Sequence, residues 1–246
     1  MSATFRLDRL LANMGYGSRR EVQGLVQAGL VTLDDAPVAA ADMRLAATQD
    51  LARRMRVNGA PLDPPPGMAL MLHKPLGVTC SHKEAGRLVY DLLPRRWRAR
   101  DPAISTVGRL DKDTSGLLLL TDDGALLHRV ISPRRHVAKR YLAMLARPLQ
   151  GHEAEAFASG ALMLEGEDKP LAPAVLEPLS ALTVRLTVTE GRYHQVRRMF
   201  AAVGNHVEAL HRDRIGALAL PADLEPGGFR LMTPEEIEAV FAQGDA

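Results

Sequence analysis

The feature that most constrains this chain is a glycine-bounded loop followed at once by a run of leucines. Residues 108–116 read Gly-Arg-Leu-Asp-Lys-Asp-Thr-Ser-Gly, and residues 117–120 are all leucine. The leucines predict a buried strand, because so apolar a run has no stable place at a surface. The loop before them holds the carboxylate of Asp111 between the cations Arg109 and Lys112. A carboxylate at a strand edge beside positive charge suits chemistry on a polyanion.

Length and composition place the chain among ordinary soluble globular proteins. It has 246 residues, of which 46% are hydrophobic and 24% charged, enough for one large domain or for a small and a medium one. No apolar run approaches the roughly 18 residues that span a bilayer, and the first residues lack the apolar stretch of a secretory signal. The single cysteine, Cys80, excludes an internal disulfide and a CxxC metal site. We therefore expect a cytoplasmic protein that does not enter a membrane.

The net charge of +2 hides an uneven distribution along the chain. Residues 67–150 contain 15 Lys and Arg against 7 Asp and Glu, whereas residues 151–246 contain 8 against 15. The positive charge therefore gathers in the segment that carries Asp111. A basic block of this kind can be a solvated face, but it is also the electrostatic footprint expected of a protein that binds a phosphate backbone.

Three consecutive prolines mark a linker at residues 62–67. Proline fixes φ and favours an extended spacer, so we predict a small N-terminal module over residues 1–61 and a larger domain over residues 68–246. In the module, apolar residues at helical spacing predict a helix over residues 6–14. Ser18 with Glu21 has the pattern of a capping box that starts a second helix.

The N-terminal module has three short segments that resemble the S4 RNA-binding domain. They run from Arg6 to Asp8, from Gly17 to Glu21 and from Gly29 to Val31. The resemblance covers roughly residues 5–50 and implies an RNA-docking surface on the two helices. The candidate contacts with RNA are arginines of this segment: Arg6, Arg9, Arg19 and Arg20.

The larger domain mixes predicted strands with predicted helices. Strands are predicted at residues 69–72, 141–144 and 182–188, the last from an alternation that places residues 182, 184, 186 and 188 on one face. One face of a helix is marked by Val196, Met199, Phe200 and Val203. Thr233 is the N-cap of another helix, with proline at its first position and Glu236 at its third, the pattern of a second capping box.

Three islands of polar residues in this domain could carry chemistry: Asp111 with its neighbours, Lys139 to Tyr141, and Glu190 to Met199. The sequence has no Walker or GxGxxG phosphate loop, no HExxH or CxxC metal motif and no GxSxG elbow, and its histidines are scattered. Any reaction is therefore expected to need no cofactor or metal, with Asp111 as nucleophile or base. A glycosidase-like pair of Asp111 and Asp113 stays open, although no stacked aromatics accompany it.

These islands and their surroundings resemble bacterial ribosomal-RNA pseudouridine synthases that join an S4 domain to a catalytic domain. The resemblance spans nearly the whole chain, and its motifs lie at residues 72–78, 108–118, 132–135, 139–142, 190–207 and 210–216. The C-terminal block is most similar to the branch that modifies one uridine of small-subunit (16S) rRNA. Two alternatives stay open: a relative that modifies large-subunit (23S) rRNA, and a non-catalytic RNA-binding factor of ribosome assembly.

The resemblance implies an α/β (α+β) protein, with a small S4-like module and a larger, mainly antiparallel mixed sheet flanked by helices. It implies isomerisation of uridine to pseudouridine with no cofactor. Asp111 is then the essential nucleophile, or the base toward the ribose, and Arg197 pairs with it. Tyr141 stacks on the uracil, and Arg109 lies near the nucleotide that leaves its stack.

Three further basic residues are expected to contact RNA: Lys74, Lys139 and Arg192. The expected partner is ribosomal RNA or a pre-ribosomal particle, and we expect the chain to act as a monomer.

Overall fold

The computed structural model describes residues 4–81 and 84–244. By packing, the chain divides into two compact units. The first consists of Met1–Ala69, Tyr90–Ser105 and Leu120–Gly124, and the second of Leu70–Val89, Thr106–Leu119 and Ala125–Ala246. Domain boundaries at residues 61 and 68 stay a prediction.

Two helices, α1 (Leu7–Asn13) and α2 (Arg19–Gln27), organise the first unit. The capping box predicted at the start of α2 is confirmed: the Glu21 amide donates to the Ser18 hydroxyl, and the Ser18 amide donates to the Glu21 carboxylate over 2.6 Å. Apolar residues of both helices, such as Leu10 and Val22, are buried in one core with Met55. Such reciprocal caps satisfy amides that have no partner inside a helix.

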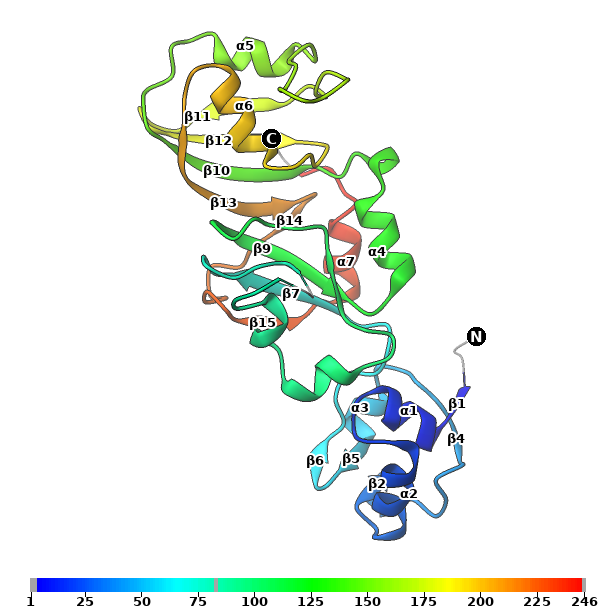
Figure 1. The fold of residues 1–246 in the computed structure, drawn as a ribbon. Helices are drawn as coiled ribbons and strands as arrows, with labels where there is room; N and C mark the ends of the chain where they lie inside the picture. Colours follow the sequence, from blue (N-terminus) through cyan, green and yellow to red (C-terminus); the bar gives the residue numbers. More distant parts are fainter. Residues whose placement is uncertain (1–3, 82–83, 245–246) are drawn as a thin grey trace. The chain divides into compact units, whose positions relative to one another are not determined.

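Short strands and one further helix complete the N-terminal part of the first unit (Figure 1). Their bounds are β1 (Thr4–Arg6), β2 (Val31–Leu33), β3 (Ala36–Pro37), β4 (Arg44–Ala46), α3 (Leu51–Arg54), β5 (Met55–Val57) and β6 (Ala60–Pro61). The strands form a sheet in the order β3-β2-β5-β6 and a pair of β1 with β4. Positive φ angles at Asp34, Asp35, Asn58 and Gly59 close its two hairpins.

The second unit is built on one sheet in the order β11-β12-β10-β13-β9-β7-β15, with β14 beside β13 and β8 beside β9 (Figure 1). The strand bounds are β7 (Ala69–Lys74), β8 (Ser105–Val107), β9 (Thr114–Thr121), β10 (Lys139–Leu145), β11 (Val175–Pro178), β12 (Thr183–Val188), β13 (Val207–Ile215), β14 (Leu218–Ala219) and β15 (Phe229–Leu231). β13 runs parallel to β9, and it is antiparallel to β10. A mixed, mainly antiparallel sheet with helices confirms the predicted fold class.

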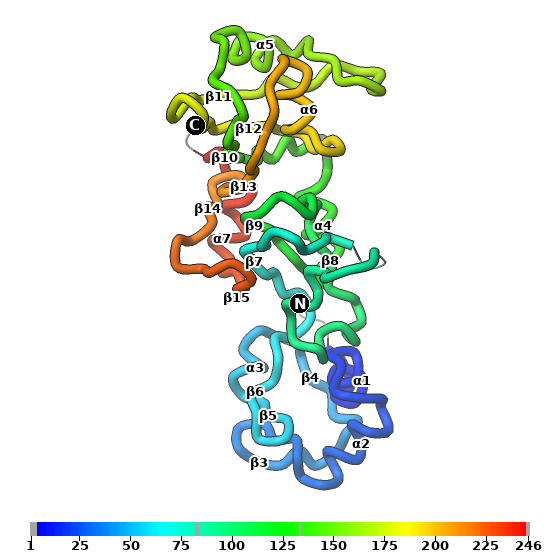
Figure 2. Tube along the Cα trace, turned by 60° about the vertical axis from the view of Figure 1, so that its left-hand side comes forward, coloured from blue at the N-terminus to red at the C-terminus, as the bar shows by residue number. Residues whose placement is uncertain are grey.

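Helices cover this sheet in two groups, whose path can be followed in Figure 2. Their bounds are α4 (Gly124–Ile131), α5 (Glu153–Ala158), α6 (Gln195–Ala202) and α7 (Pro234–Ala239), with a 3-10 turn at Pro133–Arg135. A 3-10 turn at Arg95–Ala99 belongs to the first unit, and one at Val89–Leu92 lies where the chain passes from one unit to the other. Phe157 of α5 and Phe200 of α6 pack in one core with Leu186 of β12. Val130 of α4 packs in another core with Leu117 of β9.

Two strands predicted from the apolar pattern are present, one of them shorter than expected. The leucine run is the buried centre of β9, as predicted. In β12, Val184, Leu186 and Val188 are buried, also as predicted, but Leu182 is 40% exposed. Leu182 precedes the strand, because a turn still closes at that point: the Thr183 amide donates to the Ser180 hydroxyl.

Candidate active site

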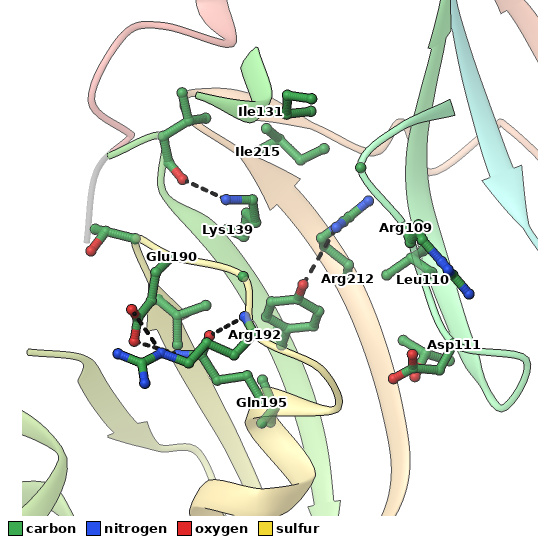
Figure 3. Close-up of a pocket in the computed structure, with 18 of the residues that line it drawn as sticks. Arg109, Leu110, Asp111, Ile131, Lys139, Glu190, Arg192, Gln195, Arg212 and Ile215 are labelled. Carbon is green, nitrogen blue, oxygen red and sulfur yellow. Dashed lines mark hydrogen bonds and ion pairs between the residues drawn. The ribbon is translucent and has the colours of Figure 1, made fainter. Parts of the chain in front are cut away.

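A cavity of about 490 Å³ opens in the second unit, within the usual size range of small-molecule sites. Its lining comes from the Asp111 loop, the end of α4, β10, the loop between β12 and α6, and β13. Figure 3 shows Arg109 and Asp111 on one side and Glu190 and Arg192 on the other, with Arg212 between them. The topology thus brings together all three islands that the sequence singled out.

The loop that presents Asp111 is fixed through its backbone. The Thr114 amide donates to the Asp111 carbonyl over 3.1 Å, and the Gly77 amide donates to the Lys112 carbonyl over 2.8 Å. Lys74 is fully buried below the loop, where its Nζ donates to the Thr114 carbonyl over 2.8 Å. The expectation that Lys74 contacts RNA is therefore corrected: its ammonium group is enclosed by protein and holds the loop instead.

The side chain that faces the Asp111 carboxylate is His194, which was not among the candidate catalytic residues. His194 Nε2 lies 3.4 Å from Asp111 Oδ1. His194 adopts a left-handed conformation with φ of 48° just before α6, and its ring stacks on Tyr193 with 3.9 Å between the ring centroids. Because left-handed backbone is costly for a residue with a Cβ, the surrounding structure must impose this position.

Arg197 does not make the pair with Asp111 that the resemblance implied. Its Nη2 lies 2.9 Å from the Asp113 carboxylate and also donates to the Asp113 carbonyl, while its Nη1 donates to the Val207 carbonyl. Arg197 thus ties the loop to the start of β13. Asp113 is 64% exposed and, among the described residues, is not part of the cavity lining, which removes the glycosidase-like pair.

Tyr141 lines the cavity from β10 and lies opposite Arg212 of β13 in the sheet. Arg212 Nη1 donates to the Tyr141 hydroxyl over 3.4 Å, and Arg212 Nε donates to the Leu117 carbonyl over 2.8 Å. Arg212 is 2% exposed. The sequence pattern gave it no role, although Leu210 and Arg212 alternate with more exposed residues on one strand, which marks an inward-facing position.

The other basic residues predicted to contact RNA differ in exposure and in the number of protein partners. Arg109 is 67% exposed, with Glu84 3.6 Å away. Lys139 lines the cavity; burial, aided by the positive charge of Arg212, lowers the pKa of Lys139 to about 8 although Glu190 opposes this. Arg192 also lines the cavity, but its guanidinium donates to protein oxygens, so its contact with RNA stays a prediction. These oxygens belong to Glu167, Lys169, Pro170 and Glu190.

Comparison of the chain with known proteins identifies the family to which this site belongs. The model of the RNA pseudouridylate synthase family matches residues 69–202, and the S4 domain model matches residues 5–50. The chain belongs to the RNA pseudouridylate synthases. It is 44% identical over 240 residues to "Ribosomal small subunit pseudouridine synthase A" of Escherichia coli (strain K12), covering 96% of this chain and 99% of that protein.

Two further relatives extend the similarity to the whole synthase. The protein of the same name from Vibrio cholerae is 40% identical over 239 residues, covering 96% of this chain and 99% of the relative. A crystal structure of a pseudouridylate synthase is 38% identical, with a TM-score of 0.67 over 96% of this chain and 99% of that one. Sequence and fold therefore agree along nearly the full chain.

In the S4 domain of the synthase, the four candidate arginines fall into two pairs. Arg6 and Arg19 both hold the carboxylate of Asp8, at 3.1 and 2.9 Å. Arg9 and Arg20 are exposed and make no hydrogen bond or ion pair with any described residue. Burial alone raises the pKa of Asp8, but hydrogen bonds from Arg6, Arg19 and Gln23 outweigh it and hold the pKa far below its usual range.

Neither a membrane-spanning helix nor a metal-binding cluster occurs in the described segments. None of their helices has the length and apolar character that a bilayer crossing requires. Nor do three or more His, Cys, Asp or Glu side chains of residues 4–81 and 84–244 gather in a way that could hold a metal ion.

Proposed function

We propose that this synthase converts one uridine of small-subunit ribosomal RNA to pseudouridine. The observation that carries the proposal is the meeting of Asp111 and Tyr141 in one cavity, in a chain similar over 96% of its length to small-subunit synthases. The isomerisation breaks the bond between N1 of uracil and C1′ of ribose, turns the base, and joins C5 to C1′. It needs no oxidant or reductant, and a carboxylate suffices to begin it.

Each cavity residue then has a role that its position supports. The uridine must leave its stack to reach Asp111, and the cavity is large enough to receive a base. Asp111 attacks C1′ or takes a proton from the ribose, and His194 holds its carboxylate. Tyr141 stacks on the uracil. Arg197 is a positioning residue, since it binds the Asp111 loop rather than Asp111 itself.

Exposed arginines supply contacts with RNA phosphates. Arg109 lies at the cavity, and Arg9 and Arg20 are the free cations of the S4 domain. Each phosphate contact contributes about 0.7–0.9 to the slope of log affinity against log salt concentration. Replacing Arg9 and Arg20 by glutamine should therefore reduce that slope by about 1.5. The matched control is Arg54→Gln, because Arg54 is already paired with Asp34; an equal reduction in the control would remove the assignment.

The decisive experiment compares two neighbouring carboxylates. Asp111→Asn should lower pseudouridine formation at least about 1,000-fold while RNA affinity stays within a few-fold. The control Asp113→Asn changes an exposed carboxylate on the same loop and should cost at most about tenfold. Rates are measured on ribosomal RNA with enzyme in excess. An Asp111→Asn enzyme that works at the wild-type rate would contradict the proposal.

The target is identified by mapping pseudouridines in both ribosomal RNAs from cells with and without the protein. One missing site in the small-subunit RNA is the expected result. Loss of a large-subunit site instead would show that the target lies in the large-subunit RNA. An unchanged map would contradict the proposed activity. Free RNA and pre-ribosomal particles are offered to the purified enzyme to learn which it prefers. A cytoplasmic monomer fits such a substrate.

A further inference from the structure

Arg212 is a buried cation without an acidic partner. It is 2% exposed, and no described carboxylate lies within ion-pair distance of it. The cavity's two acids are engaged elsewhere, Asp111 with His194 and Glu190 with Arg192. Arginine cannot shed its proton inside a protein, so the charge persists. Burying an unpaired ion costs several kcal/mol, which calls for an explanation.

The fold holds this guanidinium through neutral groups and leaves one nitrogen free. Nε donates to the Leu117 carbonyl and Nη1 to the Tyr141 hydroxyl, whereas Nη2 is buried and has no hydrogen-bond partner among the described residues. The residue lines the cavity. A buried donor without a partner is rare in native proteins and is expected where a ligand completes the site.

The backbone around Arg212 is built for close approach. Arg212 pairs with Gly116 across the parallel strands β13 and β9. A Cβ on residue 116 would lie 2.6 Å from the backbone nitrogen of Arg212. Its other neighbour in the sheet is Tyr141. Arg212 is thus fixed between β9, which follows the Asp111 loop, and Tyr141, whose ring is proposed to stack on uracil. Figure 3 shows Arg212 and Asp111 in the same cavity.

We infer that Arg212 stabilises the negative charge that uracil acquires when its bond to ribose breaks, through Nη2 to a ring carbonyl oxygen. This inference rests on the proposed function. Whether Asp111 attacks C1′ or takes a ribose proton, the electron pair of the N1–C1′ bond leaves with uracil and spreads to its oxygens. That pair returns when C5 bonds to C1′. In the same stage Asp111 leaves C1′, or the proton that it took returns to the ribose, so the carboxylate is regenerated. C5 then loses its proton and N1 gains one, so the product is an isomer.

An RNA phosphate is the other anion that this guanidinium could hold. We favour uracil because the base is the part that leaves the stack and enters the cavity. Arg212 is almost fully enclosed, whereas Arg109 is exposed and better placed for the backbone.

The test uses Arg212→Met, Arg212→Lys and two RNA substrates, transcribed with uridine or with 5-fluorouridine throughout. Fluorine makes the uracil anion a weaker base, so its bond to ribose breaks with less help. Bond rearrangement is followed in single-turnover reactions by chromatography and fragmentation mass spectrometry of the nucleosides from digested RNA, because substrate and product have the same mass. This readout does not depend on loss of the C5 proton. Arg212→Met should slow the uridine reaction about 100-fold, as loss of an oxyanion donor does, and the fluorouridine reaction at least fivefold less. Arg212→Lys should lie between wild type and Arg212→Met.

Each outcome is decisive for Arg212. An equal loss on both substrates, or an equal loss in RNA affinity that would indicate a phosphate contact, overturns the inference. Arg140→Met is the control, since Arg140 is a half-buried arginine beside Tyr141 that is paired with Asp213 outside the cavity lining. If Arg212→Met does not fold, the substrate ratio of Arg212→Lys decides alone. A wild-type enzyme inactive on ribosomal RNA would instead refute the proposed function.

Discussion

The two units of the molecule each bury a charge, and they treat it in opposite ways. Asp8 of the S4 domain is fully buried but receives hydrogen bonds from Arg6, Arg19 and Gln23. Arg212 of the catalytic unit is equally enclosed but meets only neutral oxygens. A buried charge with charged partners is compensated within the fold, whereas one without them costs stability and is available to a substrate.

A second buried pair in the first unit repeats the pattern of Asp8. Arg100 and Asp122 are both 1% exposed, with 3.0 Å between Arg100 Nη2 and Asp122 Oδ2. The Asp122 carboxylate also accepts from the amides of Gly67 and Met68. Buried charge in this unit is therefore matched by charged or hydrogen-bonding partners, and changes to it should alter stability rather than the rate of reaction.

The largest effect is expected at the glycine that admits Arg212. Gly116→Ala should lower the free energy of unfolding by about 3 kcal/mol or more, because residue 116 has φ of 114° and the new methyl group would collide with the Arg212 backbone. Gly29→Ala is the control: Gly29 also has positive φ, at 70°, but nothing lies within 4 Å of the place its new methyl group would take, so about 1 kcal/mol is expected. Urea denaturation measures both. Equal losses would mean that the close approach of β9 and β13 contributes nothing.

Asp8→Asn comes next and affects only stability. Loss of its charge-assisted hydrogen bonds should cost about 2 kcal/mol at pH 7. Because the pKa of Asp8 is lowered in the folded state, this stabilisation is present above the unfolded pKa of about 4 and is lost as pH falls below it. Denaturation between pH 7 and 2.5 should show a flatter acid limb in the variant. The turnover rate at saturating RNA should not change; a fall comparable to that of Arg212→Met would erase the contrast between the units.

Much of the fold could be predicted because its signals are local. The leucine run of β9 and the capping boxes of Ser18 and Thr233 need only neighbours in sequence, and all three are confirmed. The motif that contains Asp111 also identified one side of the cavity. Each of these features is decided within a few residues, where propensity and hydrogen bonding act directly.

The partners of the charged residues could not be predicted, because they depend on strands far apart in sequence. Arg197 pairs with Asp113 instead of Asp111, two residues further along the loop between β8 and β9. Lys74 is fully buried, with its ammonium group hydrogen-bonded to the carbonyl of Thr114 at the end of that loop. Arg212 meets residues about 70 and 95 positions earlier, through pairing with β10 and β9 that no local pattern reveals.

The smallest effect is expected at Lys139, which shares the cavity with Arg212. The pKa of Lys139 is lowered to about 8 chiefly by burial, against about 10.4 in an unfolded chain, so keeping it charged costs stability below pH 8. Lys139→Met should therefore be about 1 kcal/mol more stable than wild type at pH 7, and the difference should fade as pH rises from 8 toward 10. Lys169→Met, at an exposed lysine, should show no such trend in thermal denaturation. A variant less stable than wild type at pH 7 would mean that the buried charge of Lys139 does not lower the free energy of unfolding. The free-energy cost assigned to the buried charge of Arg212 would then also be offset by other groups of the protein.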